Sequence, residues 1–177
     1  MRIGIDISQL AYRNTGVANY LKNLLKAIVS QDRDNEYVLF YSSLRRRLDH
    51  NDIPQAPNVT LKLFHFPPVA LSFFWNRLHV FPIEQLVGPL DIFITSDWTE
   101  PPTKKAKKLT ILYDLIINRY PEEMAELIVS TQKRKLAWVK KESSAVLCIS
   151  DATKRDAQEL LGIDTSKLHV IYPGFTL

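Results

Sequence analysis

The pattern that most constrains the fold is a strand, a helix and a second strand near the end of the chain. An apolar run, Ser144 to Ile149, is followed by Ser150, a residue suited to capping a helix, and then by Gly162, a helix-stop signal. A second apolar run, 167–171, leads into Pro173-Gly174. Parallel strands need a crossover of this kind between them. The segment therefore predicts a βαβ unit.

Strands and helices alternate in the same way along the rest of the chain. Apolar positions keep helical spacing from Val17 to Ile28, a further helix is expected from Pro121 to about Glu142, and residues 69–87 are expected to be partly helical with a break near Pro82. The expected strands are 2–7, 36–41, 59–64, 91–95, 109–113, 144–149 and 167–171. Nearly continuous apolar strands are typical of a parallel sheet with helices on both faces. Residues 1–177 are thus predicted to form one Rossmann-like, doubly wound α/β domain.

Composition excludes several classes of protein. Hydrophobic residues make up 46% of the chain and charged residues 24%, as in an ordinary soluble domain. The longest uncharged stretch, 63–76, is shorter than the roughly 20 residues of a membrane-spanning helix, and Asp6 interrupts any secretory leader. We therefore expect a cytoplasmic protein. Its one cysteine, Cys148, lies inside a predicted strand and is expected to be buried and inert.

Basic residues gather in three clusters, 45–47, 104–108 and 133–141. Such clusters can attract anionic lipid head groups or nucleic acid. A solvated polar face is the commoner arrangement, however, and the formal net charge is only +4. Because no nucleic-acid-binding module is recognisable, we expect solvated clusters and no nucleic-acid partner.

Polar residues follow the predicted strands at the place where a ligand site is expected. In an open parallel sheet the ligand crevice lies beyond the carboxyl ends of the strands. The candidate residues there are Asn14, Gly16, Val17, Asp97, Trp98, Tyr113, Asp114 and Ser150. Asp97 and Trp98 combine a carboxylate with an aromatic face, which suits a sugar; a turn aspartate beside a packed indole is the alternative.

Gly16 stands immediately before the first predicted helix, where backbone amides could hold an anionic group; a plain loop glycine fits equally well. The glycine patterns of dinucleotide-binding and P-loop proteins are absent, which argues against NAD and against P-loop chemistry. The four histidines show no metal-ligand spacing. We therefore expect neither a metal nor a cofactor.

Four segments, in order, match the pattern of one enzyme family. They are Asn14 to Leu25, Asp91 to Pro102, Thr110 to Glu122 and the terminal βαβ unit with its Pro-Gly exit. Together they span nearly the whole chain. The ordered set resembles the N-terminal, acceptor-side domain of retaining family-four glycosyltransferases, group 1 or mannosyltransferase-like enzymes of the GT-B fold with two facing Rossmann-like domains.

The resemblance implies a hexosyltransferase that moves a sugar from a nucleotide-sugar, GDP- or UDP-linked, to a glycan or lipid-linked acceptor with retention and without an obligatory metal. Cell-surface polysaccharide synthesis is the expected setting. It also implies that a hinge begins near 172–177, that the C-terminal nucleotide-sugar-binding domain is absent from the chain, and that the isolated chain is inactive. Gly16 and Val17 would face donor phosphates or acceptor, and Asp114 would border the sugar cleft.

The chain departs from the family pattern just before Asp114. Where the family usually has histidine this chain has Tyr113, and a phenol cannot accept a proton near neutral pH as imidazole can. A catalytic role for Tyr113 and Asp114 therefore stands beside a second interpretation, in which Tyr113 is a strand-end aromatic packed against a loop.

Two further alternatives remain open in the sequence. Six aromatic residues lie within 64–81: Phe64, Phe66, Phe73, Phe74, Trp75 and Phe81. They form either the core side of an irregular helix or an interfacial patch that reaches a lipid-linked acceptor from a peripheral position at the inner face of the plasma membrane. A stand-alone α/β binding or interaction module without catalysis is the alternative to the enzyme.

Overall fold

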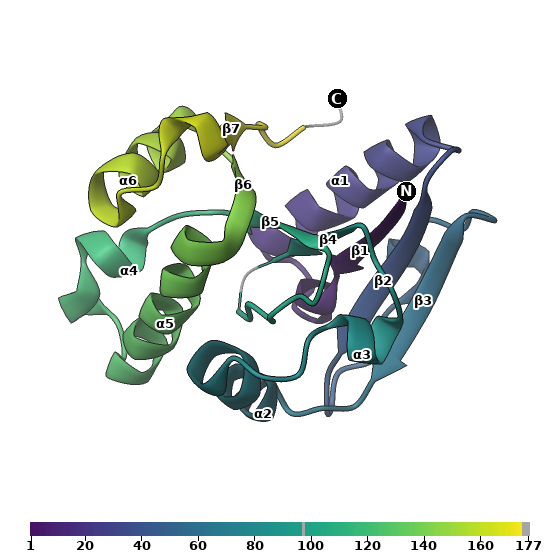
Figure 1. Ribbon diagram of the computed structural model, residues 1–177, viewed down its shortest axis with the longest axis horizontal. Coiled ribbons are helices and arrows are strands. Elements are labelled where there is room, and N and C mark those ends of the chain that lie inside the picture. The colour runs from purple at the N-terminus through teal and green to yellow at the C-terminus, as the bar shows by residue number, and fades with distance from the viewer. Residues whose placement is uncertain (97, 175–177) are drawn as a thin grey trace.

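The computed structural model describes residues 1–96 and 98–174. Within them, seven parallel strands form one sheet in the order β3-β2-β1-β4-β5-β6-β7 (Figure 1). The strands are β1 (Arg2–Asp6), β2 (Glu36–Ser42), β3 (Val59–Phe64), β4 (Ile92–Thr95), β5 (Lys107–Leu112), β6 (Ser143–Cys148) and β7 (Leu168–Val170). This confirms the predicted parallel, Rossmann-like α/β fold. The order along the sheet reverses at β1, which pairs with both β2 and β4.

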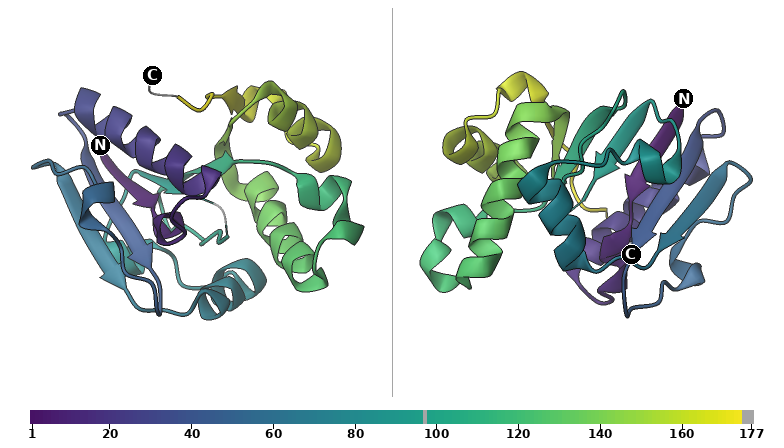
Figure 2. Two further views of the ribbon diagram at one scale, coloured as in Figure 1. Left: turned by 180° about the vertical axis from the view of Figure 1, so that it is seen from behind. Right: turned by 60° about the horizontal axis from the view of Figure 1, so that its bottom comes forward.

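Helices lie on both faces of the sheet (Figure 2). They are α1 (Gly16–Gln31), α2 (Pro68–Leu71), the π-helical η3 (Ser72–Leu78), α3 (Glu84–Val87), α4 (Ile116–Arg119), α5 (Glu126–Glu142) and α6 (Asp151–Leu161). Short 3₁₀ turns connect them: η1 (Ser8–Ala11), η2 (His50–Asp52), η4 (Pro121–Glu123) and η5 (Thr165–Lys167). As predicted, 69–87 is partly helical.

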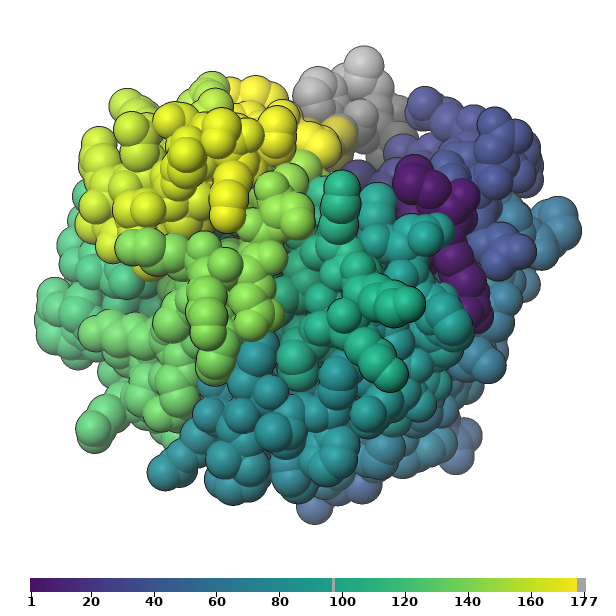
Figure 3. Space-filling model, in the orientation of Figure 1, coloured from purple at the N-terminus to yellow at the C-terminus, as the bar shows by residue number. Residues whose placement is uncertain are grey.

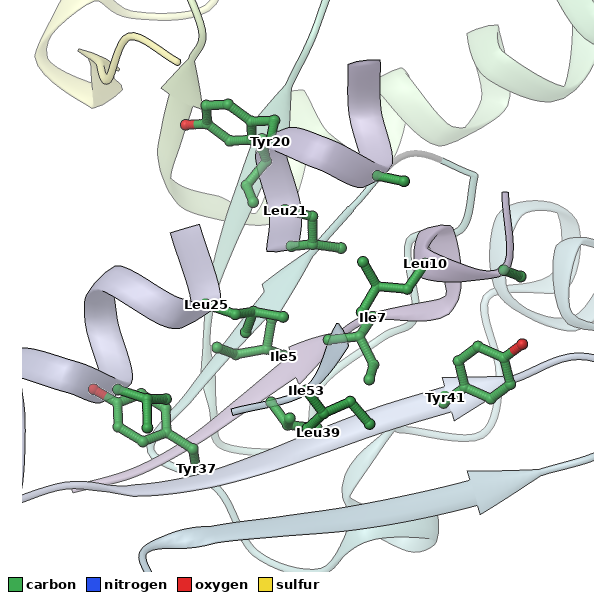
Figure 4. Packing of buried hydrophobic residues seen from close by; sticks show 14 of the residues in the cluster. Ile5, Ile7, Leu10, Tyr20, Leu21, Leu25, Tyr37, Leu39, Tyr41 and Ile53 are labelled. Carbon is green, nitrogen blue, oxygen red and sulfur yellow. The ribbon is translucent and has the colours of Figure 1, made fainter. Parts of the chain in front are cut away.

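Alternating side chains of the central strands contribute to two cores, one on each face of the sheet, and a third core lies around β6. Ile5 and Leu39 face α1, where they pack with Leu21, Leu25 and Ile53 (Figure 4). Val38, Phe40 and Phe93 face the opposite side and pack with Trp75 of η3 and Val87 of α3. Because successive strand residues point to opposite faces, one strand supplies both cores.

Gly4 is required by this packing. It pairs with Val38 on one side and Phe93 on the other, in the centre of the sheet. A Cβ at Gly4 would lie 2.6 Å from Leu90 Cδ1 and 2.7 Å from Phe93 Cδ2, distances at which the neighbours must move. Glycine thus lets Leu90 and Phe93 close over β1.

Two sequence predictions about helices and charges are corrected by the structure. The helix expected from Pro121 starts at Glu126, because Pro121–Glu123 forms a separate 3₁₀ turn and Met124 is extended, with its side chain packed on the core around β6. Lys108 and Lys135 belong to clusters that were expected to lie in solvent, yet each is only 2% exposed. Lysine stems can be buried when the ammonium group finds partners, as Lys108 does below.

The single cysteine and the end of the described chain can also be compared with the sequence predictions. Cys148 is fully buried, as expected, and burial raises the pKa of its thiol to about 11. Within the described ranges, no helix is long and apolar enough to cross a membrane. Of the residues 172–177, where a hinge was expected, only 172–174 are described. The hydroxyl of Tyr20 donates a hydrogen bond to the carbonyl of Ile171 at 3.2 Å, so the chain just after β7 lies beside α1 (Figure 1).

Candidate functional site

A cavity of about 210 Å³ lies at the carboxyl ends of β1 and β2, beside the point where the strand order reverses. It is lined by Asp6, Ser8, Gln9, Ala11, Tyr12, Ser42, Ser43, Pro68, Leu71, Trp98 and Thr99. We call it the Asp6 cavity. Its position is the one in which open α/β sheets bind ligands. Among the described residues, the lining mixes two aromatic side chains with several hydroxyl groups and one carboxylate.

Among the described residues, Asp6 is the only acidic one that lines this cavity. It is the last residue of β1 and is 5% exposed; its Oδ1 accepts a hydrogen bond from the Ser8 amide at 2.9 Å. Burial raises the pKa of Asp6, and the hydrogen bonds from Ser8 and the nearby charge of Lys135 offset only part of that effect. A buried carboxylate with a raised pKa in a cavity is a candidate for ligand contact.

The loop that follows β4 carries the opposite wall of the Asp6 cavity, and a buried network fixes it. Asn76 of η3 donates to the Trp98 carbonyl at 2.9 Å and accepts from the Glu100 amide at 2.9 Å. The Glu100 carboxylate, 0% exposed, accepts from Thr95 Oγ1 at 2.8 Å and lies 3.3 Å from Lys108 Nζ. This network holds Trp98 in place while its indole remains at the surface.

Lys108 connects that network to α5. Its ammonium donates to the Pro101 carbonyl at 3.1 Å and lies 2.7 Å from a carboxylate oxygen of Glu142. His79 also reaches Glu142, with Nε2 at 3.0 Å, and its ring stacks on Trp138 with the centroids 3.6 Å apart. Burial acts to raise the pKa of Glu142, but the hydrogen bonds from Lys108 and His79 outweigh it and lower the pKa.

Trp98 also lines a second cavity of about 290 Å³, between the 64–81 segment and α5. Its lining is Pro68, Val69, Ser72, Phe73, Arg77, Trp98, Leu127, Ile128, Thr131 and Arg134. We call it the aromatic groove. The surfaces of α5 and of the 64–81 segment adjoin in Figure 3. Trp98 and Pro68 line both cavities, so the groove and the Asp6 cavity are neighbours.

The aromatic residues of 64–81 divide between the two interpretations offered by the sequence. Trp75 is 2% exposed and packs on Phe40 in the core, so core packing holds for this residue. Phe66, Phe73, Phe74 and Phe81 are instead exposed, at 39% to 55%. The segment therefore has a core side and an apolar surface.

The predicted site residues at the start of α1 lie at the same edge of the sheet. Gly16 is the first helical residue and is exposed, and nothing lies within 4 Å of the position of a Cβ there. Thr15 caps the helix by accepting from the Ala18 amide at 3.2 Å. Val17 is half-buried, whereas Asn14, with a φ of 66°, lines a different cavity beside η2. The structure does not bring Asn14 to the Asp6 cavity.

Tyr113 and Asp114 differ sharply in exposure. Tyr113 is 7% exposed, its ring contacts Tyr20 edge-on at 5.7 Å, and its hydroxyl lies 3.2 Å from Ser96 Oγ. Asp114 is exposed and accepts from the Ile116 amide at 3.1 Å. The packing matches the interpretation of Tyr113 as a strand-end aromatic; Asp114 stays a candidate at the edge.

Ser150 acts as a helix cap. Its hydroxyl accepts from the Thr153 amide at 3.1 Å and so starts α6. Thr153 Oγ1 in turn donates to the Tyr113 carbonyl at 3.1 Å, which ties α6 to the end of β5. Asp97 lies outside the described residues. Among those described, no group of three or more metal-binding side chains is found.

Sequence reasoning missed several residues of this site. Asp6 was considered only as a charge near the N-terminus, and Glu100, Lys108 and Asn76 were not singled out. Asp6 ends an apolar strand at the expected edge, a signal that could have found it. The Glu100 network offers no comparable signal, because its partners lie in different elements.

A family model described as Glycosyltransferase Family 4 matches residues 14–177. The chain belongs to this family. The match includes Trp98, Asp114 and the whole of α1, and excludes β1 with Asp6. Among curated proteins, no sequence matches the chain.

A solved structure shares the fold of this family 4 domain. An alpha-glucosyltransferase in complex with UDP and a 13-mer DNA containing an HMU base aligns with a TM-score of 0.52 and 13% sequence identity. The alignment covers 99% of this chain and 43% of that one. An alpha-glucosyltransferase in complex with UDP and a 13-mer DNA with a central A:G mismatch gives a TM-score of 0.45 at 12% identity, over 99% and 41% of the two chains. The first likeness is one of fold.

Proposed function

We propose that residues 1–177 form the acceptor-side domain of a retaining glycosyltransferase that moves a sugar from a UDP- or GDP-sugar to a glycan or lipid-linked acceptor. The observation that carries the proposal is the Asp6 cavity, which lies at the ligand-binding edge of a domain that belongs to family 4. Cell-surface polysaccharide synthesis in the cytoplasm is the proposed setting.

The lining of the Asp6 cavity supports sugar binding. A buried carboxylate accepts hydrogen bonds from sugar hydroxyls, and an exposed indole offers an apolar face to a sugar ring. Asp6 and Trp98 provide these groups from opposite walls. In this proposal Asp6 holds an acceptor hydroxyl, Trp98 contacts the ring, and the start of α1 at Gly16 admits a phosphate or sugar oxygen because no side chain fills the space there.

A second domain completes the proposed enzyme. The chain spans 43% of the glucosyltransferase with the higher TM-score, whose crystals contain UDP. In the proposal the nucleotide-sugar rests mainly on a facing domain, and no metal is required. Residues 1–177 alone are then inactive and bind nucleotide weakly.

Calorimetry and an activity assay test this account. UDP and GDP titrated into residues 1–177 should show Kd values above about 1 mM, equivalent to less than about 4 kcal/mol of binding free energy. No transfer from UDP-glucose or GDP-mannose to sugar acceptors should be seen with the chain alone. Micromolar UDP binding, or robust turnover by this chain, would overturn the two-domain proposal.

The aromatic groove supports peripheral contact with a membrane as part of the proposal. Val69 and Leu127 are 80% and 75% exposed at its rim, beside the guanidinium groups of Arg77 and Arg134. Apolar side chains next to cationic ones favour the head-group region of anionic bilayers. Co-sedimentation with phosphatidylglycerol vesicles should be lost in Val69→Ser/Leu127→Ser. If the wild-type chain does not bind these vesicles, membrane contact is removed from the proposal.

A further inference from the structure

A larger cavity, of about 680 Å³, lies at the carboxyl ends of β2 and β3. Its lining is Tyr41, Ser43, Leu44, Arg45, Arg46, Arg47, Leu48, His50, Leu63, Phe64 and His65. We call it the arginine cavity. It contains the cluster 45–47 that the sequence analysis assigned to a solvated face. In the structure, all three arginines line this one cavity.

The cavity carries an uncompensated positive charge. Its lining, as far as the chain is described, includes three arginines and no aspartate or glutamate. Within 1–96 and 98–174, none of the three guanidinium groups forms an ion pair. The nearby carboxylate of Asp49 lies 3.2 Å from Arg13, and that of Asp52 pairs with Lys22. The acids around the cavity therefore have partners of their own.

The backbone that presents these arginines is held in place. Ser43 Oγ accepts from the Arg46 amide at 3.0 Å, and the Tyr41 hydroxyl donates to the Arg46 carbonyl at 2.8 Å. The Arg46 side chain donates to the Ala11 carbonyl at 3.1 Å and lies over the Tyr12 ring at 4.5 Å. With Arg46 anchored, Arg45 and Arg47 on either side remain exposed and available for an anion.

The lysine cluster at 104–108 lies near another cavity and shows how a basic cluster looks when a carboxylate is already present. Lys104 and Lys105 line a cavity near the amino end of β5 together with Glu84. The Glu84 carboxylate accepts from the amides of both lysines, at 2.8 Å and 2.9 Å. A carboxylate thus already occupies the anion position there. The described lining of the arginine cavity has no such group.

The arginine cavity adjoins the Asp6 cavity. Ser43 lines both, and Arg46 lies over Tyr12, which lines the Asp6 cavity. A molecule bound beside Asp6 can therefore extend into the arginine cavity. We propose that the arginine cavity binds a phosphomonoester or pyrophosphate group carried by the acceptor, with Arg45 and Arg47 as its ligands. Guanidinium groups suit this role because they pair with phosphate through two parallel hydrogen bonds.

This inference rests on the proposed function for the identity of the carrier, but anion binding can be measured without sugar transfer. Inorganic pyrophosphate is titrated into residues 1–177 by calorimetry at low salt. The variant Arg45→Gln/Arg47→Gln should bind about tenfold more weakly or worse, as expected for the loss of charge-assisted hydrogen bonds. The matched control Lys104→Gln/Lys105→Gln has the same change in net charge at another cavity and should remain within about twofold of wild type.

Vesicles separate the two sources of such a phosphate. If the chain binds phosphatidate vesicles, and if that binding is displaced by pyrophosphate and abolished by Arg45→Gln/Arg47→Gln, the phosphate is assigned to a lipid head group. Pyrophosphate binding without vesicle binding assigns it to a water-soluble acceptor. No saturable pyrophosphate binding, or equal weakening in the arginine and lysine variants, would overturn the inference. Neither result depends on whether sugar transfer is ever observed.

Discussion

Two buried carboxylates, Glu100 in the loop after β4 and Asp6 at the end of β1, have opposite surroundings. Glu100 is 0% exposed and has partners from three directions: Thr95, Lys108 and, through its backbone, Asn76. Asp6 is 5% exposed and has the Ser8 amide on one side and a cavity on the other. The two lie close enough for the charge of Glu100 to act on the pKa of Asp6.

The difference separates a carboxylate that holds structure from one that is available to a ligand. Buried polar groups in folded proteins are nearly always paired, and a partly paired one calls for an explanation. The Glu100 network fixes the loop that carries Trp98. Asp6 lines the cavity whose opposite wall this loop carries. The first group thus holds in place the cavity wall that faces the second.

The largest expected effect comes from breaking the Glu100 network. Lys108→Met leaves the buried Glu100 carboxylate without its cation, and we expect unfolding free energy to fall by about 3–5 kcal/mol. Urea denaturation of the wild type and the variant measures this difference in unfolding free energy. The neighbouring Lys107 is exposed, so Lys107→Met should change stability by less than about 0.5 kcal/mol. Equal effects of the two variants would mean that the network adds no stability.

A smaller effect on stability, but a clear one on binding, is expected at Asp6. Asp6→Asn keeps the shape and removes the charge, so stability should change by less than about 1 kcal/mol while acceptor affinity in the full enzyme falls about tenfold, or about 1.4 kcal/mol. Because burial raises the pKa of Asp6, its contribution to stability is present at low pH and is lost as pH rises through the folded-state pKa.

The stability of Asp6→Asn relative to wild type should therefore improve from about pH 4, near the ordinary aspartate pKa, to about pH 8. Denaturation at the two pH values, with the exposed Asp34→Asn as control, checks this. If Asp6→Asn destabilised the chain as severely as Lys108→Met, Asp6 would belong with Glu100 as a structural group.

The smallest expected effect is at Glu142, at the rim of the network. Lys108 and His79 outweigh burial and lower the pKa of this carboxyl, so its contribution to stability is present above the ordinary carboxyl pKa and is lost as pH falls through the folded-state pKa. Glu142→Gln should cost less than about 1 kcal/mol near neutral pH, because the side chain is partly exposed.

That cost should vanish on acidification, because a protonated glutamate resembles glutamine. Urea midpoints for the wild type and Glu142→Gln, measured from neutral pH down to the acid limb, test the convergence. A constant difference across this range would show that the contacts of Glu142 do not depend on its charge.

Local sequence patterns predicted much of the fold. Each strand was located to within two residues at either end, because burial on both faces requires a nearly continuous apolar run. Ser150 and Gly162 marked the ends of α6 correctly. The helix expected from Pro121 was placed too early, since proline with two glutamates suits a 3₁₀ turn as well as the first turn of an α-helix.

The candidate site could be predicted only as a region. The rule that ligands bind beyond the carboxyl ends of parallel strands led to Trp98 and Asp114, at the edge of the sheet where the Asp6 cavity lies. It could not show that Tyr113 is buried against Tyr20, or that Asn14 faces another cavity. Such facts depend on how a loop packs on distant elements.

The sequence by itself determined the order of strands and helices along the chain, the parallel sheet, and the resemblance that the family match confirmed. Each of these follows from the pattern of apolar and polar residues over short stretches. Only the tertiary structure decided that Lys108 is buried with Glu100 and Glu142, and that Asp6 and Arg45 line adjacent cavities. A charged side chain is stable in the interior only beside partners, and those partners come from segments that the sequence alone does not place side by side.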